Sequence, residues 1–94
     1  MPSTPRDSPG LICDLHCDTI LELQGGADLA SNPGGHVDLA RLRRGRVGLQ
    51  VFACFVPSRL SAARAHQEAN AMLDVLDAAC QRHPDEVRRR WSAR

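Results

Sequence analysis

Residues 11–19 read Leu-Ile-Cys-Asp-Leu-His-Cys-Asp-Thr, and the predicted fold begins with this segment. Its first seven residues are rich in Leu, Ile and Cys, so we expect a short strand over residues 11–17. A second apolar run covers residues 47–56, where Gln50 is the single polar side chain, and Pro57 follows it. A run of this kind, without alternation, is typical of a strand that is buried on both faces of a parallel sheet.

The segment between the two runs predicts a crossover connection. Residues 18–23 can begin a helical turn, and residues 24–35 contain four glycines, which favour a loop. Asp38 is predicted to cap a short helix over residues 39–44, and Gly45 suits the next position, where a positive φ is often required. Two strands joined through a helix indicate a parallel pair, because parallel strands need such a crossover.

A long amphipathic helix is predicted to follow the second strand. Either Ser58 or Ser61 can cap it, and Pro84 ends it at about His83. Apolar residues recur along it at spacings of three and four, which places them in one stripe. The stripe consists of Ala62, Ala65, Ala69, Met72, Leu76 and Ala79. The order of strand, short helix, strand and long helix predicts an α/β fold.

The chain has 94 residues and a formal net charge of +1, which allows one small domain or part of a larger one. We expect residues 1–10 to be a flexible lead-in without the apolar core of a signal peptide, and residues 11–94 to form the domain. No run is long enough to cross a bilayer, so no membrane partner is predicted. Four cysteines outside a disulfide pattern favour free, buried thiols in a cytoplasmic protein. They are Cys13, Cys17, Cys54 and Cys80.

Arginines cluster in residues 41–46 and 88–90, which raises the question of nucleic acid. Acidic residues follow or precede these clusters, and Trp91 stands without other aromatic residues that could stack on bases. A solvated, charge-balanced face is therefore the better interpretation, and no nucleic-acid partner is predicted.

Asp14, His16 and Asp18 form the candidate chemical site. Because side chains on a strand alternate between faces, the three are expected to point the same way. Imidazole nitrogen and carboxylate oxygen are normal ligands of zinc and similar divalent metals. The carboxyl end of a strand is also where α/β barrels place their active sites. The His-x-Asp pair alone is a weak signal, since it also occurs as a hydrogen-bonded pair on a surface.

The remaining histidines and glutamates have simpler interpretations. His36 is expected to serve the entry to the short helix, and His66 and His83 to be solvated on the long helix. Glu22 and Glu68 are expected at the surface. The glycine-rich loop lacks a phosphate-binding pattern, so flexibility or a lid is the plain interpretation.

Residues 14–19 are similar to the opening motif of the renal (membrane) dipeptidase family, which reads Asp-x-His-x-Asp at the end of the first barrel strand. Residues 36–50, which include His-Val-Asp-Leu and Arg-Gly-Arg-Val-Gly-Leu-Gln, resemble the second segment of that family. Phe52, Phe55 and Pro57 continue the second block. The resemblance runs from about Ile12 to the end of the sequence, and two blocks in the right order are more specific than either alone.

The resemblance implies the N-terminal portion of a (β/α)8 TIM barrel, with two zinc ions in the complete fold and dipeptides hydrolysed through a metal-activated water. His16 and Asp18 match the first pair of zinc ligands. A later bridging glutamate and two later histidines have no counterpart, so the chain alone is expected to bind zinc weakly and to be inactive. Phe55 stands where some members have Tyr near the substrate, which puts that contact in doubt. For Asp14 we expect a supporting or structural role.

A second hypothesis is a small non-catalytic α/β protein that associates with a partner through its Ala-rich helix. Under the first hypothesis, the open edge and apolar faces of an incomplete sheet also predict association, including a homo-oligomer. Association that is unaffected by His16→Ala would favour the second hypothesis.

Overall fold

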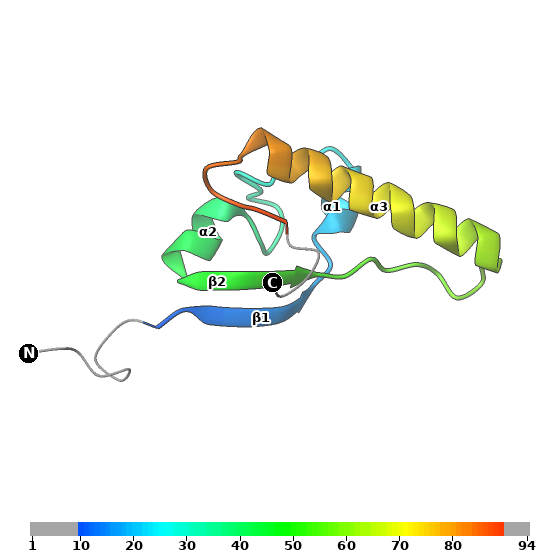
Figure 1. Ribbon diagram of the computed structural model, residues 1–94, viewed down its shortest axis with the longest axis horizontal. Helices are drawn as coiled ribbons and strands as arrows, with labels where there is room; N and C mark the ends of the chain where they lie inside the picture. Colours follow the sequence, from blue (N-terminus) through cyan, green and yellow to red (C-terminus); the bar gives the residue numbers. More distant parts are fainter. Residues whose placement is uncertain (1–9, 90–94) are drawn as a thin grey trace, which may run out of the picture.

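The computed structural model describes residues 10–89, and within them the chain forms two strands and three helices (Figure 1). The strands are β1 (Ile12–Cys17) and β2 (Val47–Phe52), and the helices are α1 (Ile20–Gln24), α2 (Leu39–Arg44) and α3 (Ala62–Arg82). β1 and β2 pair in parallel, and α1, a loop and α2 make the crossover between them. The predicted α/β class and order of elements are confirmed.

The helices cover the strand pair incompletely. All three lie on the β2 side of the pair in Figure 1, where α1 packs on α3 and α2 packs on β2. Leu15 on β1 and both Leu49 and Val51 on β2 remain exposed. The prediction of a strand over residues 47–56 that is buried on both faces is therefore wrong. The strand ends at Phe52, and within residues 10–89 the helices form a single layer on one side of the strand pair.

The buried core lies among the helices and the crossover loop. Its members are Ile20 and Leu23 of α1, Leu29 of the loop, Leu39 of α2, and Met72, Leu76, Ala79 and Cys80 of α3. Half-buried Phe52 packs against this core from β2. The C-terminal half of the predicted apolar stripe thus faces inward, whereas Ala62 at its start is exposed.

Two predicted helix caps are confirmed. The carboxylate of Asp38 accepts hydrogen bonds from the backbone N–H of Arg41 at 2.8 Å and from that of Asn32 at 2.9 Å. Ser61, rather than Ser58, begins α3, and its hydroxyl accepts from the backbone N–H of Arg64 at 3.2 Å. Each cap satisfies a backbone donor that the first turn of its helix leaves without a partner.

The C-terminal part of the glycine-rich crossover loop, residues 32–35, is hydrogen-bonded to both neighbouring helices. Buried Asn32 donates through Nδ2 to Oε1 of Glu22 on α1 at 2.7 Å. On the other side, the guanidinium of Arg41 donates to the carbonyl oxygens of Gly35 and Pro33. Glu22 is therefore half-buried and hydrogen-bonded, in contrast to the predicted surface position.

The end of α2 differs from the prediction by one residue. Gly45 has a φ of −82°, and its N–H still bonds the carbonyl oxygen of Arg41 at 2.8 Å. The helical turn thus continues through Gly45, and the positive φ of 60° falls on Arg46. A non-glycine residue seldom takes this conformation.

All four cysteines are free, as predicted, but only Cys80 is buried. Burial raises the pKa of its thiol because desolvation disfavours the thiolate. Cys13 is exposed on β1, the strand that lies farthest from the helices, so the prediction of burial is wrong there.

A matched pair of isoleucines tests the location of the core. Ile20 is 0% exposed and Ile12 is 54% exposed. Ile20→Val should lower the free energy of unfolding by about 1 kcal/mol, because it leaves space in a packed interior. Ile12→Val should change it by less than about 0.5 kcal/mol. Urea unfolding followed by circular dichroism measures both, and equal losses would place the core elsewhere.

The Asp38 cap predicts a pH dependence of stability. Hydrogen bonds from the backbone of Asn32 and then of Arg41 hold the pKa of Asp38 below the ordinary 3.8. Because the folded-state pKa is lowered, this stabilisation is complete above pH 3.8 and is lost as the pH falls through the folded value. We expect Asp38→Asn to weaken the fall in urea midpoint below that pH, whereas Asp74→Asn, at an exposed position of α3, should leave the fall unchanged.

Candidate metal centre

His16 and Asp18 lie together at the carboxyl end of β1. The strand ends at Cys17, and the chain then enters α1 through Asp18 and the buried Thr19. Nε2 of His16 is 3.2 Å from Oδ1 of Asp18. The side chains are 67% and 54% exposed, so the imidazole and the carboxylate are both accessible to an ion from solvent.

Asp14 is engaged elsewhere. Its Oδ2 accepts a hydrogen bond of 2.7 Å from Nε2 of Gln50 on β2, and both side chains are half-buried. The pairing of the strands is irregular between Asp14 and Cys17, which interrupts the alternation that predicted one shared face for three side chains. Within residues 10–89, no group of three or more His, Cys, Asp or Glu side chains could hold a metal ion.

The pair of His16 and Asp18 fits zinc as part of a site. A ring nitrogen and a carboxylate oxygen are both ordinary zinc donors, and their atoms already lie within hydrogen-bond distance of each other. Protein zinc sites use about three or four side-chain ligands, however. The described residues thus supply two donors of the correct kind, and a tight site requires further ligands.

The other histidines lie apart from this pair. His36 is exposed in the loop before α2, and Nε2 of His66 is 3.0 Å from Nδ2 of Asn70 on the surface of α3. His83 is half-buried, with Nε2 3.4 Å from Oδ1 of Asp28, so its predicted solvation is wrong. A hydrogen bond from the backbone of Ala30 holds the pKa of Asp28 below its usual value, and His83 adds to this effect.

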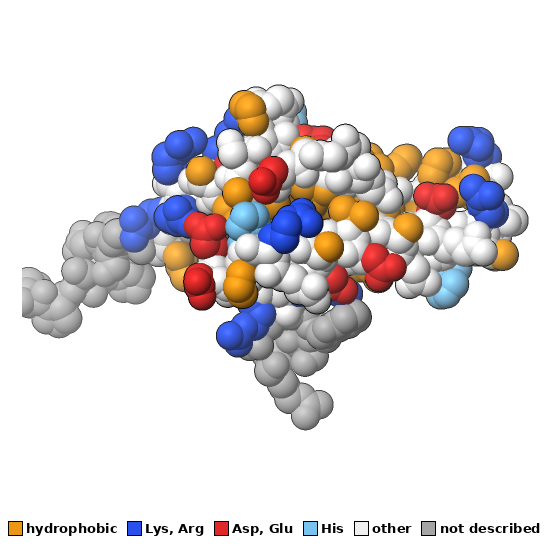
Figure 2. Space-filling model, turned by 90° about the horizontal axis from the view of Figure 1, so that it is seen from above, with side chains coloured by type: hydrophobic (Ala, Val, Ile, Leu, Met, Phe, Trp, Pro, Cys, Tyr) orange, Lys and Arg blue, Asp and Glu red, His pale blue; other side chains and the backbone are white. Residues whose placement is uncertain are grey.

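Several arginines are held in ion pairs within the chain. Arg43 on α2 pairs with Glu86, and Arg89 pairs with Asp77 on α3. Figure 2 shows acidic side chains placed among the basic ones on the face that α3 covers. These pairs follow the charge balance that the sequence indicated.

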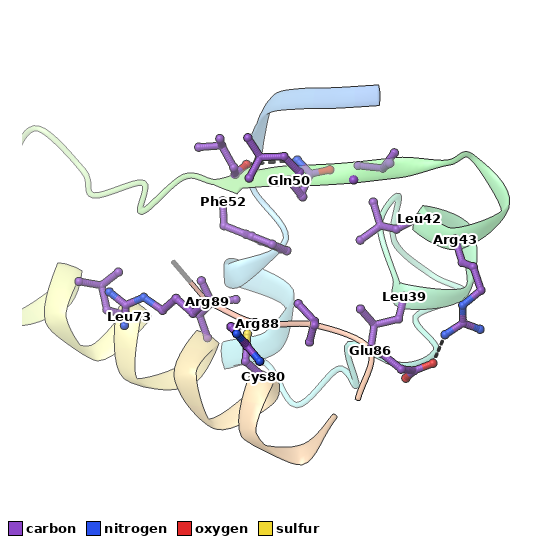
Figure 3. Close-up of a pocket in the computed structure, with 16 residues that line it drawn as sticks. Leu39, Leu42, Arg43, Gln50, Phe52, Leu73, Cys80, Glu86, Arg88 and Arg89 are labelled. Carbon is purple, nitrogen blue, oxygen red and sulfur yellow. Dashed lines mark hydrogen bonds and ion pairs between the residues drawn. The ribbon is translucent and has the colours of Figure 1, made fainter. Parts of the chain in front are cut away.

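A cavity of about 550 Å³ lies between β2, α2, α3 and the segment that follows α3 (Figure 3). Its walls are largely apolar and include Leu42 and Phe52, and the Arg43–Glu86 ion pair lies at its rim. Neither His16 nor Asp18 lines it. This cavity is thus separate from the candidate metal ligands.

Comparison with known proteins identifies the family. A family model described as Membrane dipeptidase (Peptidase family M19) matches residues 8–93, which is most of the sequence. Comparison with curated proteins and with solved structures finds no match. Over residues 10–89, no helix has both the length and the hydropathy that crossing a membrane requires. The match extends through both strands, all three helices and the His16–Asp18 pair, and the chain belongs to the membrane dipeptidase family, peptidase family M19.

Proposed function

We propose that this chain contributes the first two strands of a (β/α)8 barrel, together with the first two zinc ligands, to a dipeptidase. The position of His16 and Asp18 at the carboxyl end of β1 is the observation that carries the proposal. In α/β barrels this end of the strands forms the active site. The family match adds the peptidase chemistry, and the full-length members of the family act on dipeptides.

The pair would bind the metal through a ring nitrogen of His16 and a carboxylate oxygen of Asp18. Zinc, when bound, polarises a substrate carbonyl and activates water for hydrolysis near neutral pH. The contribution of this chain is to hold two donors at the end of a strand. The buried Thr19 and Ile20, directly after Asp18, anchor the start of α1 in the core and so fix the path of the chain beyond the ligands.

The exposed strand residues fit a sheet that continues in the complete fold. Leu15 on β1 is 72% exposed, and Leu49 and Val51 on β2 are also exposed. In a parallel sheet, both faces are normally covered by other structure, so large apolar side chains on either face are buried. We propose that further barrel strands and helices cover them, and that the 94-residue chain by itself tends to associate, with homo-oligomers as one outcome.

The alternative of a non-catalytic protein that binds a partner through its Ala-rich helix has less support. Met72, Leu76 and Ala79, which form half of the apolar stripe, are buried in the core of the chain itself. The C-terminal half of the stripe is therefore already packed inside the chain and is not free to bind a partner.

Zinc binding tests the metal site directly. We expect the 94-residue chain to bind Zn²⁺ weakly, and His16→Ala to reduce affinity on the order of tenfold or more, because one of two donors is lost. His66→Ala, at an exposed position of α3, is the matched control and should leave the affinity unchanged. Zn²⁺ titration followed through the imidazole NMR signals of all four histidines measures both. A response at His66 or His83 with none at His16 would contradict the proposal.

Dipeptide hydrolysis tests the need for additional ligands. The 94-residue chain, supplied with Zn²⁺, should show no hydrolysis above the rate of Zn²⁺ alone, because two donors cannot hold the ion as a complete catalytic site does. Release of free amino acids from a panel of dipeptides measures this. Hydrolysis that His16→Ala abolishes would show that the chain is sufficient for catalysis and would contradict the expectation.

A further inference from the structure

Two polar residues remain without a role in the proposed zinc site, and the structure joins them. Asp14 opens the motif that contains His16 and Asp18, and Gln50 is the single polar residue in an apolar strand. Their side chains meet across β1 and β2 in a hydrogen bond of 2.7 Å. A polar pair that interrupts two apolar strands loses solvation on folding, so it requires a compensating interaction.

The chemistry of the pair fixes which group donates. An ionised carboxylate can only accept, so the NH₂ group of Gln50 faces Oδ2 of Asp14. The same Nε2 lies 3.2 Å from the carbonyl oxygen of Val51, which gives the amide group a second acceptor. Because its NH₂ group faces two acceptors, the Gln50 side chain is held in one orientation. A hydrogen bond to a charged carboxylate is also among the stronger kinds.

The strand pairing is irregular on both sides of this bond. Asp14 is paired with Gln50, and Cys13 with Leu49, but the register shifts before Cys13 and again after Asp14. Between Asp14 and Cys17, β1 contains one residue more than the matching part of β2, and His16 lies in this extra length. A bulge of this type redirects a side chain and weakens the backbone ladder around it.

Register decides where His16 points. A slip of one residue moves every side chain of a strand to the opposite face. The regular pairing around Asp14 is short, so the backbone alone specifies the register weakly. The Asp14–Gln50 hydrogen bond adds a side-chain contact that only one register satisfies, and it lies directly before the bulge that carries His16.

We propose that Asp14 and Gln50 are positioning residues that lock the register of β1 on β2 and thereby hold His16 and Asp18 together as metal ligands. The proposal rests on the proposed function for its metal, but its structural part concerns the chain without metal. Neither Asp14 nor Gln50 binds the ion; they act through His16 and Asp18. Partners that orient metal ligands in proteins typically contribute about 10- to 100-fold to metal affinity.

Two variants distinguish the effect of the Asp14–Gln50 hydrogen bond from the effect of the negative charge on Asp14. Gln50→Leu removes the donor and leaves the carboxylate of Asp14 in place, whereas Asp14→Asn removes the charge and leaves an oxygen that can accept from Gln50. If the bond positions His16, Gln50→Leu should weaken Zn²⁺ binding by about tenfold, and Asp14→Asn should weaken it less. Gln67→Leu on α3, an exposed position, is the matched control and should have no effect.

The experiment titrates the isotope-labelled 94-residue chain with Zn²⁺ and follows the imidazole of His16 by NMR, with urea midpoints measured in parallel. A tenfold weaker response of His16 in Gln50→Leu, at an unchanged midpoint, supports the proposal. Equal Zn²⁺ affinity in wild type and Gln50→Leu overturns it and leaves the proposed function intact. If Gln50→Leu fails to fold, Asp14→Ala breaks the same bond from β1.

NMR spectra recorded without metal show whether the zinc-site proposal or the positioning proposal has failed. No response of His16 to Zn²⁺ in the wild-type chain contradicts the proposed function. In that case, the metal-free signals of His16 and Asp18 decide the positioning claim. Shifts in Gln50→Leu that are absent in Gln67→Leu support it, and unchanged signals overturn it.

Discussion

The parallel pairing of β1 with β2 determines how the other elements of the chain are arranged. Parallel strands cannot be joined by a tight turn, so the chain must cross over between them. Helix α1, the glycine-rich loop and α2 fill this crossover, with Asn32 and Asp38 as its internal ties. The same pairing brings the carboxyl ends of both strands to one edge, where His16 and Asp18 lie.

The core and the candidate site are supported by different parts of the chain. The buried residues come from the helices and the loop, and the strands contribute only half-buried side chains such as Phe52. The sheet therefore presents apolar surface to solvent while the helices are well packed. Under the proposed positioning role, the register of the two strands depends on local contacts such as Asp14–Gln50.

Features set by neighbours in the sequence were predictable. Asp38 and Ser61 act on backbone groups within three residues, and His16 and Asp18 are two residues apart, so their spacing was sufficient. Features set by tertiary packing were not. An apolar run indicates that burial of its side chains is favourable, but it does not show which other elements are present to bury them. Leu49 and Cys13 were therefore predicted to be buried, and both are exposed.

Polar contacts between residues far apart in the sequence were also not predicted. The partner of Asp14 is 36 residues away, and that of His83 is 55 residues away, and no local pattern connects either pair. The shift of positive φ from Gly45 to Arg46 is a further example, because one additional hydrogen bond at the end of α2 moves the turn. For Asp14 and His83 the sequence shows the residue but not the distant partner that determines its surroundings.

Zinc K-edge X-ray absorption of the zinc-loaded 94-residue chain shows whether His16 and Asp18 bind the metal, because it identifies the atoms bound to the ion. If His16 and Asp18 bind the zinc, we expect only nitrogen and oxygen neighbours at about 2.0–2.2 Å, with the multiple-scattering signature of one imidazole, which the His16→Ala variant should lack. A shell of sulfur at about 2.3 Å would show that the free cysteines hold the zinc instead, and it would contradict a site built from His16 and Asp18.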